Sequence, residues 1–170
     1  IFSELLYEFM IEQVEVKFPR WIDGLDTNNQ LKIELFESVQ NATKEIAKLH
    51  PSFMSVTYGA GGGTSKYTLE IAKQIKQQYN VPTLAHLTCV SSTKDTVRKR
   101  IADIKAAGIE NIMALRGDIP VELQNTDRSN WDYHNAIQLV RELKESGADF
   151  CIGGACYPET HLEAPDAITD

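Results

Sequence analysis

The stretch I-M-A-L-R-G-D-I-P at residues 112–120 decides the fold of this chain. Four apolar residues come first, the polar triplet Arg116-Gly117-Asp118 follows, and Pro120 ends regular structure because proline has no amide hydrogen for a strand ladder. A continuous apolar run is typical of a buried strand in a parallel sheet. The sequence therefore predicts a strand whose carboxyl end opens into a polar turn, the place where α/β folds bind ligands.

The turn itself has the composition of a binding site. Gly117 allows a positive φ or the close approach of a ligand, while Arg116 and Asp118 supply a cation and an anion on either side. Such a turn also serves as a plain connection in α/β proteins. Other strands that end in polar residues favour the binding interpretation.

Strand-like segments alternate with amphipathic helical segments along the whole chain. Alternating apolar and polar residues predict a strand at 14–18, and largely apolar segments predict strands at 53–58, 83–89, 112–115 and 149–155. Apolar residues spaced by three and four predict helices at 31–49, 67–79, 95–107 and 132–146. This alternation requires a parallel sheet with right-handed crossovers, so we predict a single α/β domain over residues 1–170.

The composition excludes several classes of protein. With 170 residues, 42% of them hydrophobic and 24% charged, the chain is typical of a globular protein. A net charge of −7 disfavours a nucleic-acid partner, and the basic run at 94–100 is interpreted as the solvated face of a helix. No apolar run approaches the length of a membrane span, so we expect no membrane association.

The three cysteines form no disulfide pattern, which favours a reducing compartment and a cytoplasmic location. The spacing of Cys151, Cys156 and His161 matches no standard zinc motif. We therefore expect no metal site.

Polar residues gather where the predicted strands end. They are Glu15, Thr57-Tyr58, His86, Arg116-Gly117-Asp118, and Tyr157 with His161. Each has a structural alternative: Glu15 suits a solvated strand position, His86 a hydrogen-bonded core position, and Tyr157 simple packing. Because the carboxyl ends of parallel strands share one edge of the sheet, their coincidence predicts one site.

A glycine-rich run at 59–63 precedes a predicted helix, which suggests either an anion cradle or a flexible loop capped by Thr64 or Ser65. It is not a Walker motif, because no Gly-Lys-Ser/Thr triplet occurs.

Four of these motifs together resemble the methylenetetrahydrofolate reductase family, in both order and spacing. They are S-V-T-Y-G-A at 55–60, A-H-L-T-C at 85–89, A-L-R-G-D at 114–118 and Y-P-E-x-H at 157–161. The resemblance implies a (β/α)₈ TIM barrel, of which this chain supplies about five βα units. It also implies flavin-dependent reduction of 5,10-methylenetetrahydrofolate to 5-methyltetrahydrofolate, with FAD as cofactor and NADH or NADPH as hydride donor.

The resemblance assigns residues to the cofactor. The positions that fall where the family contacts FAD are Tyr58, Ala60, His86, Arg116, Gly117, Asp118, Tyr133, Ala155, Tyr157, His161 and Asp170. Thr57 falls on the nicotinamide and folate side. The family does not use the glycine run as a phosphate cradle, which leaves Ala60 as a backbone contact.

Two carboxyl groups are implied as catalytic. Glu15, in V-E-V-K-F-P-R, corresponds to the acidic residue of a family pattern like F-E-F-F-P-P-R and would protonate the departing nitrogen of the folate. Asp118 would stabilise the cationic folate intermediate. Arg116 and His86 would hold the cofactor.

Two alternatives stay open: a truncated, non-catalytic module that binds flavin or nucleotide, and a different open α/β enzyme that uses the same strand ends. A complete barrel takes roughly 250 residues, and an incomplete one leaves unpaired strand edges. We therefore expect a fragment of a longer barrel, a homo-oligomer, or a subunit that another subunit completes.

Overall fold

The computed structural model describes residues 13–16, 29–57, 65–157, 159–161, 164 and 166. Its elements follow one another in the order β1 (Gln13–Val16), α2 (Asn29–Ala47), β2 (Phe53–Val56), α3 (Ser65–Tyr79), β3 (Thr83–Thr88), α4 (Lys94–Ala106), β4 (Asn111–Leu115), the 3₁₀ turn η2 (Val121–Leu123), α5 (Ala136–Glu145) and β5 (Cys151–Gly154). The glycine run, Tyr58, Ala60 and Asp170 lie outside the described residues.

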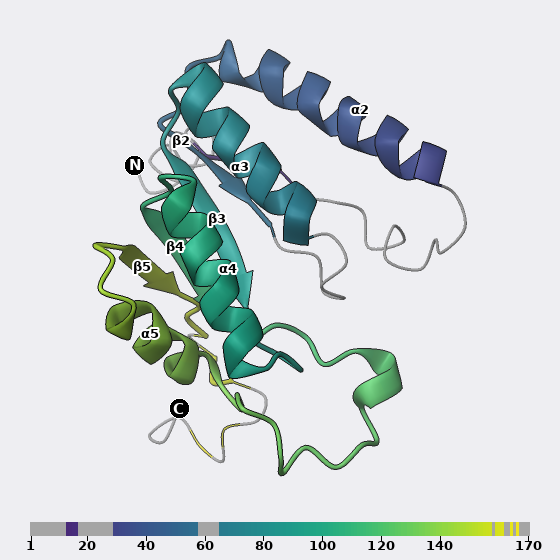
Figure 1. Cartoon of the computed structure of the whole chain (residues 1–170), viewed down its shortest axis with the longest axis vertical. Helices are drawn as coiled ribbons and strands as arrows, with labels where there is room; N and C mark the ends of the chain where they lie inside the picture. Colours follow the sequence, from purple (N-terminus) through teal and green to yellow (C-terminus); the bar gives the residue numbers. More distant parts are fainter. Residues whose placement is uncertain are drawn as a thin grey trace.

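The five strands form one parallel sheet in sequence order, β1-β2-β3-β4-β5. Figure 1 shows the helices gathered on one side of it. A right-handed crossover that returns each time to the next position places every helix on the same face. The predicted parallel α/β sheet is confirmed, and its carboxyl ends share one edge.

The helix-covered face of the sheet, called the outer face below, carries the core. Its strand residues are fully or almost fully buried: Met54, Val56, Thr83, Ala85, Leu87, Ile112 and Ala114. They pack against buried helix residues such as Ile71 and Ile75 of α3 and Leu139 and Leu143 of α5. At about 25 cal/mol for each Å² of apolar surface buried, this layer is the main source of stability.

The alternate residues point to the opposite face, called the inner face below. On this face Leu84, His86, Met113 and Leu115 are only half-buried. Ser55 is more enclosed, at 9% exposed.

Side-chain caps fix where the helices begin. Thr93 caps α4, because its Oγ1 accepts from the Thr96 amide at 3.2 Å.

The predicted helix at 132–146 begins later, at Ala136, for two reasons. Asp132 instead accepts from the Lys94 amide at 2.9 Å, at the start of α4, and the Gln138 side chain accepts from the Asn135 amide at 3.1 Å.

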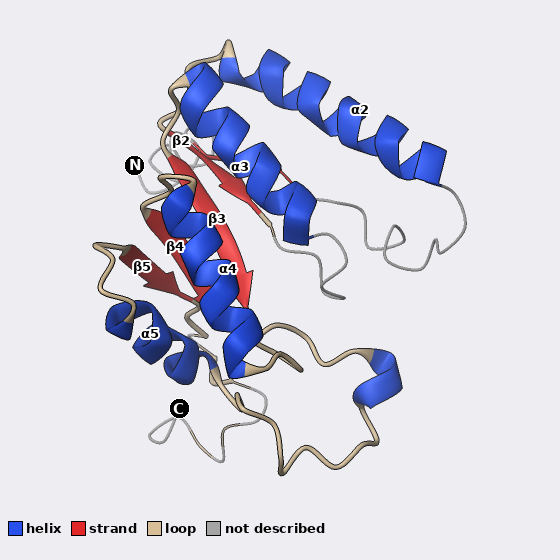
Figure 2. Ribbon diagram, in the orientation of Figure 1, coloured by secondary structure: helices blue, strands red, loops and turns tan. Residues whose placement is uncertain are grey.

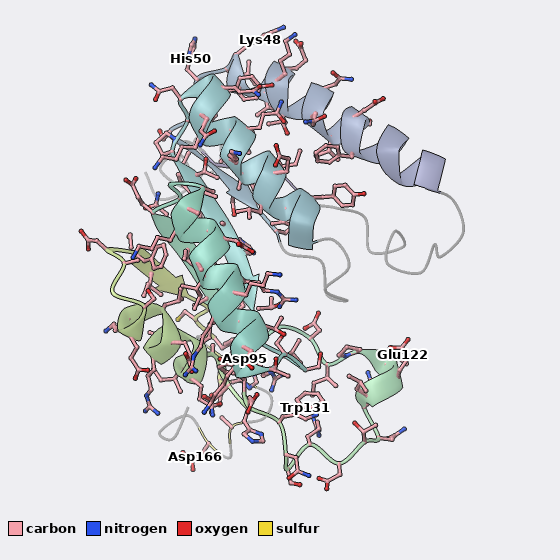
Figure 3. All side chains as sticks on the ribbon, in the orientation of Figure 1. Lys48, His50, Asp95, Glu122, Trp131 and Asp166 are labelled. Carbon is pink, nitrogen blue, oxygen red and sulfur yellow. The ribbon has the colours of Figure 1, made fainter. Side chains whose placement is uncertain are left out.

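The β4–α5 connection leaves the body of the domain at the carboxyl edge of the sheet. Figure 2 shows it as a long loop that carries the η2 turn. In Figure 3, Glu122 and Trp131 lie on this loop, whereas Lys48 and His50 lie at the other end of the domain. No helix within the described ranges is both long and apolar enough to cross a membrane.

Candidate functional site

The first part of the site joins β2 to β3 on the inner face. Ser55 Oγ lies 2.8 Å from His86 Nε2, a hydrogen bond between neighbouring strands. His86 was predicted as a site residue, and Ser55 was not. The signal for Ser55 was its position in the quoted S-V-T-Y-G-A motif, two residues before Thr57 and therefore on the same face of the strand.

The turn after β4 is held by the turn after β3. The carbonyl oxygen of Arg116 accepts from the Cys89 amide at 3.2 Å and from the Val90 amide at 2.8 Å. Arg116 Nε also donates to the Gly117 carbonyl at 3.3 Å. Arg116 is half-buried and Asp118 is exposed, so the two charges stand at the edge of the sheet on a fixed backbone.

Gly117 is required by this turn for two separate reasons. Its φ of +89° is one that side-chain-bearing residues rarely adopt, which confirms the predicted positive φ. A Cβ at this position would also lie 3.0 Å from both Thr88 Cβ and Val90 Cγ1. The close packing of these two turns therefore depends on a glycine.

Cys89 lies buried beneath the same turn. Its Sγ is 3.7 Å from the Leu115 carbonyl oxygen and 3.9 Å from that of Asn135. Burial raises the pKa of the Cys89 thiol to about 11, against the opposing effects of a backbone hydrogen bond and the Arg116 charge. The thiol is consequently a packed, protonated group rather than a nucleophile.

The β5 end contributes an aromatic pair. The rings of Tyr157 and His161 meet edge to face, with centroids 4.7 Å apart and an interplanar angle of 86°. Tyr157 is 50% exposed and Ala155 is also exposed. A large ring held in place but open to solvent is suited to contact a planar ligand.

The ends of β1 and β2 complete the edge. The Thr57 carbonyl accepts from Thr68 Oγ1 of α3 at 3.2 Å, which anchors the end of β2. Glu15 is in register with Ser55, so its main chain lies beside the residue whose side chain bonds His86.

Tyr133 differs from the other candidates because it is buried in the core. It is 2% exposed and belongs to the same buried cluster as Leu139 and Leu143, and burial raises the pKa of its phenol to about 12. Within the described part of the chain its hydroxyl has no hydrogen-bond partner. The ring and its hydroxyl are therefore both enclosed in the core.

The structure therefore places Thr57, Arg116-Gly117-Asp118 and Tyr157 with His161 after the carboxyl ends of their strands, and His86 two residues before the end of β3. Together they offer a guanidinium, an imidazole, a carboxylate and an open aromatic ring. Among the described residues no group of three or more His, Cys, Asp or Glu side chains is arranged to hold a metal ion. The chemistry suits a planar, anionic organic ligand.

Comparison with known proteins gives a family match over most of the chain. Residues 32–170 match the family model described as "Methylenetetrahydrofolate reductase". The match covers the four strand-end motifs and every described candidate except Glu15.

Individual relatives agree. The "5,10-methylenetetrahydrofolate reductase" of Pectobacterium carotovorum is 38% identical over 137 residues, which cover 81% of this chain and 44% of that protein. "Methylenetetrahydrofolate reductase 2" of Schizosaccharomyces pombe is 37% identical over 123 residues, 72% of this chain and 19% of that protein. "Methylenetetrahydrofolate reductase (NADH) 1" of Zea mays is 36% identical over 136 residues, which cover 78% of this chain and 22% of that protein. The chain thus spans less than half the length of each of these relatives.

Proposed function

The chain belongs to the methylenetetrahydrofolate reductase family, and from this membership we propose that it forms part of a flavin-dependent (β/α)₈ barrel that reduces 5,10-methylenetetrahydrofolate to 5-methyltetrahydrofolate. One structural observation carries the proposal. The family's strand-end motifs lie on successive parallel strands, and two of them are joined directly where the Arg116 carbonyl accepts from the Cys89 and Val90 amides.

The difference in burial between the two faces of the sheet supports the proposal that this chain is part of a barrel. The outer face is closed by helices, whereas the inner face leaves apolar residues such as Leu84 and Met113 half-buried. In a closed barrel the inward residues of all strands fill the centre. Further strands, from a longer chain or from a completing subunit, would cover this face.

The residues present fit FAD as the cofactor. FAD combines a planar ring system with an anionic diphosphate, and the site offers the open ring of Tyr157 and the half-buried cation of Arg116. His86 and Thr57 would supply polar contacts. When bound, FAD supplies the two-electron chemistry between a reduced nicotinamide and the folate. The NADH named in the maize relative favours NADH as the donor here, with NADPH as the alternative.

Two carboxyl groups would serve the folate. Glu15 would hold the proton that the departing nitrogen of the methylene bridge needs before the bridge can open. Asp118, exposed at the β4 end, would place negative charge near the cationic carbon that results. Arg116 and His86 would orient the cofactor rather than react.

The test is Glu15→Gln in a complete protein that contains this chain. Amide for carboxyl keeps the shape and removes the proton, so folate reduction should fall by roughly 10²–10⁴-fold, the range for a positioned general acid. Flavin reduction by the nicotinamide should change little, because that step takes no proton from Glu15. Both are measured as anaerobic stopped-flow half-reactions followed by flavin absorbance.

Glu37→Gln is the matched control, since Glu37 is exposed on α2 and should leave both half-reactions unchanged. Loss of both rates in Glu15→Gln would indicate damaged flavin binding. Unchanged rates in both would contradict the role of Glu15.

A further inference from the structure

Ser55 is an enclosed polar side chain with a defined partner and no assigned role. It is 9% exposed, and its Oγ lies 2.8 Å from His86 Nε2. An enclosed hydroxyl without a partner costs free energy, so the pairing with His86 satisfies both groups.

The strand register shows what this bond does to the imidazole. Ser55 is in register with Leu84, two residues before His86, so the His86 side chain reaches back and across to β2. A histidine side chain can occupy several staggered χ1 rotamers. The bond to Ser55 selects a rotamer that directs the imidazole toward β2. The alternative would direct it toward β4, where Met113 is the register partner of His86.

A hydroxyl is suited to this task because it both donates and accepts hydrogen bonds. It can donate to Nε2 of a neutral imidazole and accept from Nε2–H when that nitrogen carries a proton. The ring therefore keeps its position in either tautomer, which a donor-only or acceptor-only partner could not ensure.

We propose that Ser55 is a positioning residue for the strand-end site, which acts by holding the His86 imidazole over β2, the strand that leads into Thr57. The inference rests on the proposed function, since the ligand that His86 meets is taken to be the flavin nucleotide.

The test compares Ser55→Thr with Ser55→Val, two β-branched variants of nearly equal shape of which only the first keeps a hydroxyl. Thr83→Val is the matched control, because Thr83 is a buried hydroxyl residue on the outer face of the neighbouring strand. All are made in the complete protein that contains this chain.

The first measurement needs no flavin. The ¹⁵N resonances of the imidazoles are recorded by NMR, and the His86 signal is identified by its absence in His86→Gln. The His86 Nε2 resonance should move in Ser55→Val and return to its original position in Ser55→Thr, while Thr83→Val leaves it in place. Identical His86 resonances in the two Ser55 variants would overturn the proposal.

The second measurement is titration with FAD. Loss of the hydrogen bond should raise the dissociation constant roughly 2- to 10-fold in Ser55→Val, with near-original affinity in Ser55→Thr. Equal affinity in both variants, while the unmodified chain binds FAD, would overturn the role of Ser55 alone. Failure of the unmodified complete protein to bind FAD would overturn the proposed function itself, and the role of Ser55 with it.

Discussion

Along β3, Ala85 and Leu87 are buried beneath the helices, whereas Leu84 and His86, on the opposite face of the same strand, are only half-buried. One strand thus contributes every second residue to the core and every other residue to the face that carries the candidate site. The difference separates two kinds of substitution. Outer-face changes should reduce stability, and inner-face or strand-end changes should affect ligand binding at a smaller cost in stability.

The largest expected effect on stability is that of Leu87→Ala. Leu87 is fully buried, so its truncation should lower the free energy of unfolding by about 2–5 kcal/mol. Leu84→Ala, on the same strand but half-buried, should cost about 1–2 kcal/mol because less surface returns to water. Urea denaturation measures both. Equal losses would show that the inner face is as closed as the outer one.

The next effect is a pH dependence from the buried thiol of Cys89. Below pH 8 the thiol is protonated in both the folded and the unfolded state, so it makes stability no more dependent on pH. Between its ordinary pKa of 9.0 and its folded pKa of about 11, the unfolded state ionises first. Stability should therefore fall by up to about 3 kcal/mol as the pH rises through this window.

Cys89→Ala should reduce this alkaline loss, and Cys151→Ala, which changes an exposed thiol, should not. Part of the slope should persist in Cys89→Ala, because burial also raises the pKa of Tyr133 to about 12. Denaturation curves at several pH values measure the effect. An unchanged slope in Cys89→Ala would mean that the thiol is less buried than the structure shows.

A smaller effect on stability should come from Gly117→Ala, in the turn that follows β4. The positive φ and the contacts with Thr88 and Val90 should together cost about 1–3 kcal/mol. Gly147→Ala isolates the backbone part, because Gly147 also has a positive φ of 66° but has no neighbour within 4 Å of the added Cβ. Chemical denaturation of the two variants gives the difference, and equal losses would argue against the close packing of the two turns.

The sequence predicted the sheet well because its three central strands are short, largely apolar segments between clear helix and turn signals. The helix at 132–146 was placed too early, since Asp132 fits a helix by its spacing but instead accepts a hydrogen bond from the Lys94 amide at the start of α4. That contact joins residues 38 positions apart, and no local pattern reports it.

The candidate site was predictable to the extent that it lies in motifs. Arg116-Gly117-Asp118 stood out by composition, and His86 by its place in an apolar strand. Ser55 was missed because its place in the S-V-T-Y-G-A motif did not distinguish it from its neighbours, and only the strand register shows its partner. The burial of Tyr133 was equally hidden, since it depends on packing against α5.

The central claim is that the carboxyl ends of these strands form a flavin site, and equilibrium titration with FAD, followed by the change in flavin fluorescence, tests it most directly. The unmodified protein should bind FAD, and Arg116→Gln should weaken binding roughly 10- to 100-fold through loss of a charged contact. Arg98→Gln is the matched control, because Arg98 lies on α4 and its guanidinium pairs with the carboxylate of Glu142 on α5. A protein that purifies without flavin and cannot be reconstituted with FAD, or an Arg116→Gln variant with unchanged affinity, would contradict the account.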